Sequence, residues 1–157
     1  MLDATDIAIL KALQENGRIR RKDIAAATGL SQPAVNGRLK KLEDKGYILG
    51  YTVLLNPTGF GKNVTAFISV CLDTRKHGED FFRRVDSQGD ILECHAVTGE
   101  STHLLKVRTD SLRTLEALIG VIGAWPGVKS LCTSVVLATR KETLSFPIEE
   151  HVMQGGG

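Results

Sequence analysis

The stretch GLSQPAVNGRLKKLEDKG, from Gly29 to Gly46, has the pattern of a short amphipathic helix between two glycines. Ser31 can cap its first turn, and Pro33 fits there because an N–H in that turn has no helical partner. Its apolar side chains recur at helical spacing and share one face: Val35, Leu39 and Leu42. The opposite side is small, polar and basic. The helix therefore has one face for a core and another for an outside partner.

The outer face of this helix has residue types that suit DNA. A recognition helix enters the major groove by its N-terminal end, so its outer face cannot be bulky. Asn and Gln side chains pair with base edges, whereas Lys and Arg meet phosphates. The candidate DNA-binding residues are Arg20, Arg21, Ser31, Gln32, Pro33, Asn36, Arg38, Lys40 and Lys41. Two roles are open for Arg38: it binds a phosphate, or it braces the helix by pairing with an acidic residue.

The segments around this helix complete a known DNA-binding pattern. Residues 2–17 and 20–29 each have the apolar spacing of a helix, and a Gly-Leu-Ser turn precedes the third helix. The stretch YILGYTVLLNP that follows is rich in strand-forming residues and predicts a two-stranded ribbon. Many amphipathic helices have a basic face that is simply exposed to solvent. Here the three-helix spacing, turn and ribbon together predict a winged helix-turn-helix over 1–50, with ribbon and linker over 51–63.

The rest of the chain alternates between strand and helix patterns in the order βαββαβ. Strands are predicted over 64–73, 91–99, 102–109 and 128–139, and helices over 77–88 and 111–124. This order is typical of the ferredoxin-like fold. We therefore predict an α+β protein with a ferredoxin-like regulatory or oligomerisation domain over 64–141. A tail follows over 142–157, and its three final glycines predict a loose end.

Such a sheet carries both helices on one face and leaves the other face open. The open face is predicted to show charges of both signs and scattered apolar groups: Glu93, His95, Lys106, Arg108, Phe67 and Leu104. This mixture favours a partially buried surface for self-association. A fully solvated face is the alternative.

Composition limits the class of protein. The chain has 157 residues, of which 42% are hydrophobic and 24% charged, so it can bury a core and stay soluble. Residues 1–50 hold nine Lys or Arg against six Asp or Glu, whereas the whole chain has a net charge of only +2. The basic excess therefore lies in the candidate DNA-binding part. Three cysteines without a C-x-x-C pair, no signal-like start and no long apolar run predict a cytoplasmic protein without a membrane span.

Several stretches resemble the Lrp/AsnC family of bacterial and archaeal transcription regulators, also called feast/famine regulatory proteins. They are LDATDIAILKALQENGR, GLSQPAVNGRLKKLEDKGYILGY, GFGKNVTAFISV, VTGESTHLLKV and PGVKSLCTSVVL, and they span residues 2–147 in order. The resemblance implies a winged helix-turn-helix followed by a regulatory domain that senses amino acids. It also implies dimers, often assembled into octameric rings, and a roughly palindromic operator on double-stranded DNA.

The resemblance also implies an effector site between neighbouring dimers. In the family this site is built around a turn with the pattern Gly-(Asp/Glu)-X-Asp, which corresponds here to Gly99, Glu100, Ser101 and Thr102. Thr102 replaces the usual Asp, which would suit an α-amino group. Thr133 and Ser134 resemble positions near the family pocket. An amino-acid effector is thus the only small molecule implied, with no cofactor and no metal.

Two other functions compete with this interpretation. The altered turn leaves room for an effector-independent DNA-organising protein whose second domain only assembles the oligomer. An enzyme would have to use Cys94, His95, Glu100 and His103. Cys94 and His95 are adjacent in a predicted strand, so their side chains point to opposite faces. We therefore expect no catalytic residues.

Overall fold

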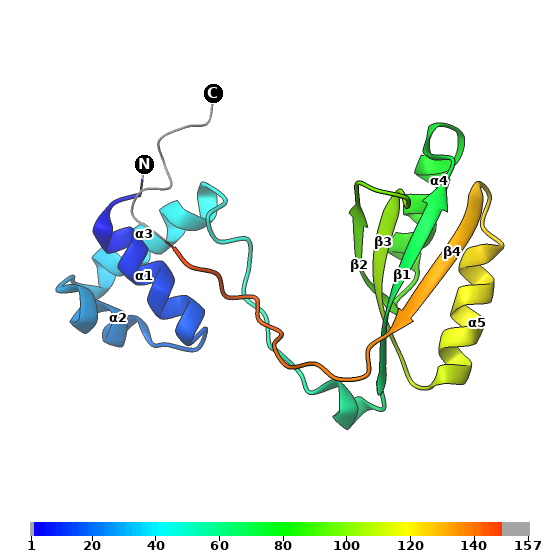
Figure 1. Ribbon diagram of the computed structural model, residues 1–157. Coiled ribbons are helices and arrows are strands. Elements are labelled where there is room, and N and C mark those ends of the chain that lie inside the picture. Colours follow the sequence, from blue (N-terminus) through cyan, green and yellow to red (C-terminus); the bar gives the residue numbers. More distant parts are fainter. Residues whose placement is uncertain (1, 149–157) are drawn as a thin grey trace. The chain divides into compact units, whose positions relative to one another are not determined.

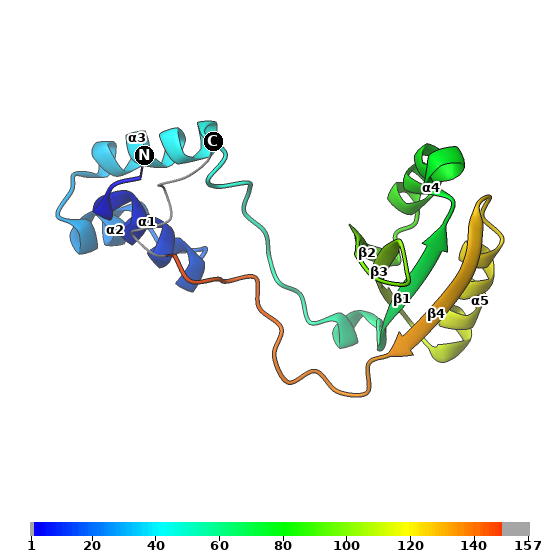
Figure 2. The same ribbon diagram turned by 45° about the horizontal axis from the view of Figure 1, so that its top comes forward.

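The computed structural model describes residues 2–148, which form two compact units (Figures 1 and 2). The first unit contains the residues up to Leu54 together with those from Lys141 onward. The second unit is Leu55–Arg140. The predicted α+β class is confirmed, and the glycine-rich end lies outside the described residues.

Three helices make up most of the first unit: α1 (Ala4–Glu15), α2 (Arg21–Thr28) and α3 (Gln32–Asp44). Gly29 ends α2 with a φ of 70°, a left-handed conformation that glycine adopts without steric cost. Ser31 caps α3 by accepting a hydrogen bond from the Ala34 N–H at 3.3 Å. The core of this unit contains the apolar faces of all three helices: Ile9, Leu10, Ile24, Ala25, Val35, Leu39 and Leu42.

The predicted ribbon after α3 is not formed in this chain. Tyr47 and Ile48 pack partly against the core, but residues 48–56 contain no strand. Leu49, Val53 and Leu54 have exposed fractions of 96%, 75% and 76%. Residue composition predicts an extended backbone, but a strand also needs a partner backbone to accept its hydrogen bonds. No segment of the described chain supplies that partner here, so the connector stays extended and unpaired.

The second unit has the predicted order of elements. After the short 3-10 helix η1 (Pro57–Phe60), the strands are β1 (Val64–Leu72), β2 (Ile91–Ala96), β3 (His103–Thr109) and β4 (Val128–Val135). The helices are α4 (Thr74–Ser87) and α5 (Leu112–Gly123). The sheet order is β2-β3-β1-β4 with antiparallel pairing throughout, and both helices lie on one face (Figure 1). The ferredoxin-like prediction is confirmed.

The core of this unit lies between the sheet and its two helices. The buried side chains alternate along β1 and β3 and meet the inner faces of α4 and α5: Ala66, Ile68, Val70, Leu72, Leu105, Val107, Phe81, Val85, Leu115, Leu118, Ile122 and Trp125. Several predicted boundaries were wrong. Helix α4 begins at Thr74 rather than at residue 77, and strand β2 ends at Ala96 rather than at 99. Strand β4 ends at Val135 rather than at 139. It runs antiparallel to β1, and only two residues of β1, Val64 and Thr65, lie beyond the Ala66–Val135 pair.

The open face of the sheet has the predicted mixture of groups. Lys106 Nζ lies 3.1 Å from one oxygen of Glu93, and His95 Nε2 lies 3.2 Å from the other. The hydrogen bonds from His95 and Lys106 hold the pKa of Glu93 below its usual range. Phe67 lies opposite Lys106 in the register, so an apolar ring adjoins this charged cluster.

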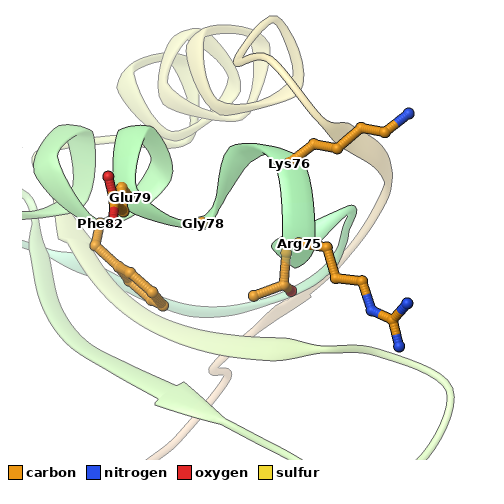
Figure 3. Close-up of a pocket in the computed structure, with 6 residues that line it drawn as sticks. Arg75, Lys76, Gly78, Glu79 and Phe82 are labelled. Carbon is orange, nitrogen blue, oxygen red and sulfur yellow. The ribbon is translucent and has the colours of Figure 1, made fainter.

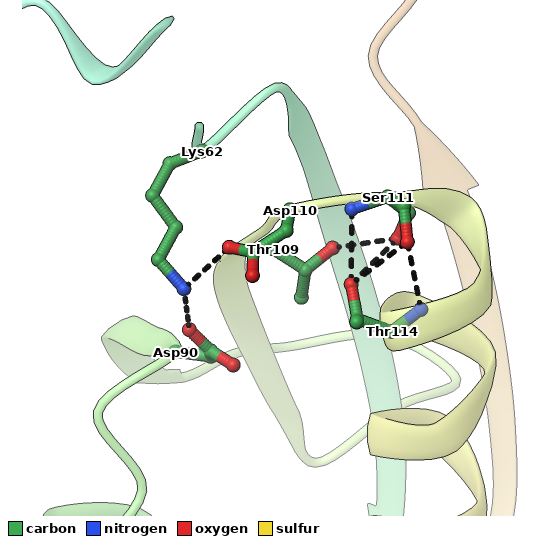
Figure 4. Close-up of polar contacts among 6 residues, drawn as sticks. All are labelled: Lys62, Asp90, Thr109, Asp110, Ser111 and Thr114. Atoms are coloured by element: carbon green, nitrogen blue, oxygen red, sulfur yellow. Dashed lines mark hydrogen bonds and ion pairs between the residues drawn. The ribbon is translucent and has the colours of Figure 1, made fainter. Parts of the chain in front are cut away.

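Lys62, which precedes β1, forms ion pairs with two aspartates that lie next to β2 and β3. Its Nζ atom lies 2.8 Å from Asp110 Oδ1 and 2.9 Å from Asp90 Oδ1 (Figure 4). The hydrogen bonds that Lys62 donates to Asp110 and Asp90 raise the pKa of Lys62. Figure 4 also shows the capping box of α5, in which Ser111 and Thr114 exchange side-chain to backbone hydrogen bonds.

The chain returns to the first unit after the sheet, which the sequence did not predict. Ile148 packs against the first core, and Ser145 Oγ donates to Gln14 Oε1 at 3.5 Å. The first unit is therefore built from two separate parts of the sequence.

Candidate nucleic-acid interface and effector turn

The outer face of α3 presents polar and basic side chains to solvent. Gln32, Pro33, Asn36, Lys40 and Lys41 are all exposed, whereas the apolar stripe of the helix is buried. The periodicity of the sequence therefore predicted correctly that these five residues lie off the buried face of the helix. A helix with one fully buried face and a short-chained outer face near its N-terminus has the form of a major-groove reader.

Gly37 lies on the same outer face. A Cβ atom built there would meet nothing within 4 Å, and the backbone φ of Gly37 is not positive. Neither space nor backbone conformation inside this chain thus requires a glycine.

The other candidates around α3 have partners within the protein. The Ser31 hydroxyl caps α3, so its role in the chain itself is structural. Arg20 Nε donates to Asp23 Oδ2 at 2.9 Å. Arg21 lies beside Tyr51, whose hydroxyl donates to Glu43 Oε1 at 2.9 Å. Burial is the main cause of the raised pKa of Tyr51, with Glu43 adding to it.

Arg38 bonds to two acidic side chains at the start of α1. Its Nη1 atom donates to Asp3 Oδ2 at 2.6 Å and to Asp6 Oδ1 at 2.7 Å. These hydrogen bonds raise the pKa of Arg38, and the one to Asp3 lowers the pKa of that carboxyl. The sequence left two roles open for Arg38. Its contacts match the second, in which it stabilises the helix by pairing with acidic residues.

The candidate effector turn joins β2 to β3. The Val97 N–H donates to the Thr102 carbonyl at 3.0 Å, and Gly99 has a φ of 109°, which favours glycine. Glu100 is exposed and is the only carboxylate in the Gly99–Thr102 turn. The turn therefore offers one acidic group to a ligand.

The Thr102 side chain is directed at β1. Its Oγ1 atom donates to the Val70 carbonyl at 3.0 Å and accepts from the Leu72 N–H at 3.0 Å. The hydroxyl thus adds two hydrogen bonds to the β1 backbone at the end of the β1–β3 pairing. The sequence identified Thr102 as a departure from the family pattern, but not this use of its hydroxyl, because Val70 and Leu72 are some thirty residues away.

His103, next to Thr102, is buried in an aromatic cluster. Its ring centroid lies 5.2 Å from that of Phe81 and 5.4 Å from that of Phe82, and only 3% of the residue is exposed. Its Nδ1 atom lies 2.9 Å from Thr102 Oγ1. Burial lowers the pKa of His103.

The structure does not bring the two β4 candidates to one site. Thr133 lies opposite the buried Ile68 and therefore belongs to the helix-covered face. Ser134 lies opposite Phe67 on the open face. Adjacent residues of a strand point to opposite sides, so one pocket within this chain cannot use both side chains.

A hollow of about 490 Å³ lies on α4. It is lined by Thr74, Arg75, Lys76, Gly78, Glu79 and Phe82, none of which was predicted from the sequence as a site residue. Figure 3 shows the Arg75 and Lys76 side chains extending away from Gly78 and Phe82. Half of the lining residues are charged, and the Phe82 ring also packs on His103.

The groups proposed for an enzyme do not converge. Cys94 lies opposite Leu105, on the helix side of the sheet, whereas His95 lies opposite Leu104 on the open side. Burial raises the pKa of Cys94, which disfavours a reactive thiolate. Over residues 2–148, no three His, Cys, Asp or Glu side chains are grouped to hold a metal.

Comparison with known proteins identifies the family. Residues 2–48 match the model described as winged helix-turn-helix DNA-binding, and residues 65–146 match the Lrp/AsnC ligand binding domain. The chain belongs to the Lrp/AsnC family. It is a DNA-binding transcription regulator of this type.

Individual relatives cover almost the whole chain. The proline dehydrogenase transcriptional activator of Rhizobium radiobacter is 40% identical over 145 residues, which are 90% of this chain and 93% of that one. A transcriptional regulator of Neisseria meningitidis in complex with L-Met has a TM-score of 0.89 and 34% identity, covering 94% of this chain and 97% of the other. A feast or famine regulatory protein from M. tuberculosis complexed with L-methionine has a TM-score of 0.86 and 28% identity, covering 93% and 99%.

A search of the described helices for a membrane span found none long and apolar enough.

Proposed function

We propose that this Lrp/AsnC regulator reads DNA bases through Gln32 and Asn36 and binds phosphates through Lys40 and Lys41. The observation that carries the proposal is the division of α3 into a buried apolar stripe and an exposed polar face. Amide side chains near the N-terminus of a groove-entering helix pair with adenine edges, and the lysines further along meet the backbone. The protein acts on DNA in the cytoplasm and catalyses no reaction.

The second unit assembles the regulator. The open sheet face, with its apolar and charged groups side by side, serves as a surface for self-association into dimers and larger rings. A two-fold dimer presents two copies of α3, so the operator is roughly palindromic. Assembly then decides which spacing of half-sites the protein recognises.

An amino acid or similar small molecule bound between dimers tunes this assembly. The L-methionine complexes of the two structural relatives support an amino acid. In this chain Glu100 is the group of the turn that would meet an α-amino group. A ligand that binds one assembly better than another shifts the population toward it, and DNA affinity changes with it.

Base readout is tested by comparing Asn36→Ala with Lys40→Ala. Each variant is titrated with a duplex that the wild-type protein selects from a random pool, and with a shuffled duplex of the same length. Asn36→Ala should lose about 1–3 kcal/mol on the selected duplex and little on the shuffled one. Lys40→Ala should weaken both about equally and reduce the salt slope by about 1. Equal losses for Asn36→Ala would remove Asn36 as a base reader.

A specific observation favours a second candidate function, an effector-independent DNA-organising protein. Thr102 carries no carboxylate, and its hydroxyl is already bonded to β1 at both Val70 and Leu72. The turn therefore keeps the first acidic position of the pattern, Glu100, but lacks the second. In this alternative the second unit serves assembly alone.

The two candidates are separated by a ligand screen. The purified protein is melted with each of the twenty amino acids at millimolar concentration, and its mass is followed by light scattering. A ligand at one hundred times its Kd stabilises the native state by about 2.7 kcal/mol, which shifts the melting temperature by several degrees. A hit that also changes the mass supports an effector that acts through assembly. No response to any amino acid supports the effector-independent candidate.

A further inference from the structure

The capping box of α1 has two carboxylate oxygens left over, and both meet Arg38 of the recognition helix. Asp3 Oδ1 accepts from the Asp6 N–H at 2.8 Å, and Asp6 Oδ2 accepts from the Asp3 N–H at 3.2 Å. The remaining oxygens, Asp3 Oδ2 and Asp6 Oδ1, both accept from Arg38 Nη1. The box therefore fixes two acceptors independently of α3, and one guanidinium nitrogen fits between them.

This contact lies beside the interface rather than in it. Asp6 is a buried residue with 6% of its side chain exposed, and the Arg38 side chain is 31% exposed. Lys40, two residues further along α3, is fully on the exposed face. Arg38 is thus positioned to hold α3, while its neighbour remains available to DNA.

The position of Arg38 on the helix determines what it can control. At about 100° per residue, Arg38 borders the buried stripe on one flank, and Gln32 and Asn36 follow on the other flank. Rotation of α3 about its axis therefore moves both flanks together. A helix with its side chains is about 10 Å across, so a rotation of about 20° displaces a side-chain tip by roughly 2 Å. Such a displacement breaks a bidentate hydrogen bond to a base.

We infer that Arg38 is a positioning residue for base readout, which fixes the rotation of α3 through Asp3 and Asp6 instead of binding a phosphate. Phosphate binding tolerates small rotations, because long lysine side chains follow a displaced backbone. Base pairing by short amides does not. Loss of the Arg38 contact should therefore reduce sequence preference much more than affinity for DNA in general.

This inference rests on the proposed base readout, and its test uses the same selected and shuffled duplexes with the full-length protein. Arg38→Gln is expected to weaken binding to the selected duplex about ten-fold and to the shuffled duplex less than about two-fold. Its salt slope should equal that of the wild type. Lys40→Gln is the matched control, because it removes the same charge from the exposed face. It should weaken both duplexes and reduce the salt slope by about 0.9.

Asp6→Asn gives the sharpest test because it removes a negative charge from a DNA-binding protein. On charge alone, this variant should bind both duplexes more tightly. We expect it instead to lose preference for the selected duplex, since Arg38 loses an anchor, while binding to shuffled DNA is kept or improved. Arg38→Lys retains the charge and should recover part of the preference lost in Arg38→Gln.

The opposite results would overturn the inference. A smaller salt slope with equal losses on both duplexes for Arg38→Gln would make Arg38 a phosphate ligand. An unchanged sequence preference in Asp6→Asn would show that the contact between Arg38 and Asp6 does not position α3. Retained binding to shuffled DNA shows that a variant is folded, and should Arg38→Gln fail to fold, Asp6→Asn and Arg38→Lys decide the question. A wild-type protein that selects no duplex would instead refute the base readout on which the inference rests.

Discussion

Thr102 shows how one hydroxyl can be committed to the fold at a position where the family uses a carboxylate. It accepts from the Leu72 N–H and donates to the Val70 carbonyl, so it joins the end of β3 to the end of β1. A ligand that recruited this hydroxyl would have to break both bonds. In the described structure the Thr102 hydroxyl therefore serves the fold.

Replacing Thr102 by Val should destabilise the second unit. Valine has nearly the same shape but cannot bond to β1, so the half-buried Leu72 N–H loses its partner. Leaving such a group unsatisfied costs about 1–3 kcal/mol in the free energy of unfolding. Urea unfolding followed by Trp125 fluorescence measures the change, because Trp125 is the only tryptophan and is buried in this unit. Thr102→Ser keeps the hydroxyl and should retain most of the stability. Equal losses for both variants would assign the effect to packing.

His103 predicts a pH dependence of the same unit. Its folded-state pKa is lowered from 6.5 by burial, so the unfolded chain binds more protons than the folded chain just below pH 6.5. The free energy of unfolding should therefore fall as the pH drops through 6.5 toward the lower folded pKa. Well above pH 6.5 His103 is neutral in both states and contributes no slope. Urea titrations with Trp125 fluorescence between pH 7.5 and 5.5 measure this.

A variant assigns that slope. His103→Gln should be less stable, because it loses the aromatic packing, but its stability should vary less with pH in this range. An unaltered slope in His103→Gln would contradict the assignment.

Helix α3 contains a glycine, Gly37, that neither space nor backbone conformation requires. It lies on the face proposed to bind DNA. Gly37→Ala should stabilise the helix, because Ala is favoured over Gly by about 1 kcal/mol in a helix interior and space is free at this position. If the DNA backbone or bases approach Gly37 closely, the added methyl group should at the same time weaken DNA binding. Amide exchange of α3 and titration of the selected duplex measure the two effects. Higher stability with unchanged DNA affinity would show that DNA does not approach this position.

The connector after α3 shows where element prediction from composition fails. Its residues favour extended backbone, and the backbone is extended, but the predicted pairing is absent in residues 48–56. Pairing depends on a second segment at the right distance, which no local propensity contains. The large exposed side chains of Leu49, Val53 and Leu54 are the direct consequence.

Along the sequence, the second unit is inserted between the two parts of the first. The chain leaves the first unit after Leu54 and returns to it at Lys141, so two segments connect the units covalently. Ile148 anchors the return by packing on the first core. The DNA-binding unit thus depends on residues that follow the regulatory sheet.

Ile148→Ser should therefore destabilise the DNA-binding unit and leave the regulatory unit unchanged. Removing a partly buried apolar side chain of this size costs about 1–2 kcal/mol. Amide exchange of peptides from α1 and α3 should become faster, while urea unfolding reported by Trp125 should not move. Leu144→Ser is the control, because Leu144 lies on the same returning segment with 70% of its surface exposed. Equal effects of the two substitutions would mean that Ile148 is no anchor.

Local patterns in the sequence predicted the helices, the βαββαβ order and the exposed face of α3. Each of these follows from a local pattern: the apolar period, the cap at Ser31, and the glycine that ends α2. The packing of the elements set the partner of Arg38, the use of the Thr102 hydroxyl and the return of Ile148. Arg38 and Asp3 are 35 residues apart, and Thr102 and Val70 are 32 apart. Periodicity fixes which way a side chain faces along its own element, whereas a contact between elements depends on how they pack.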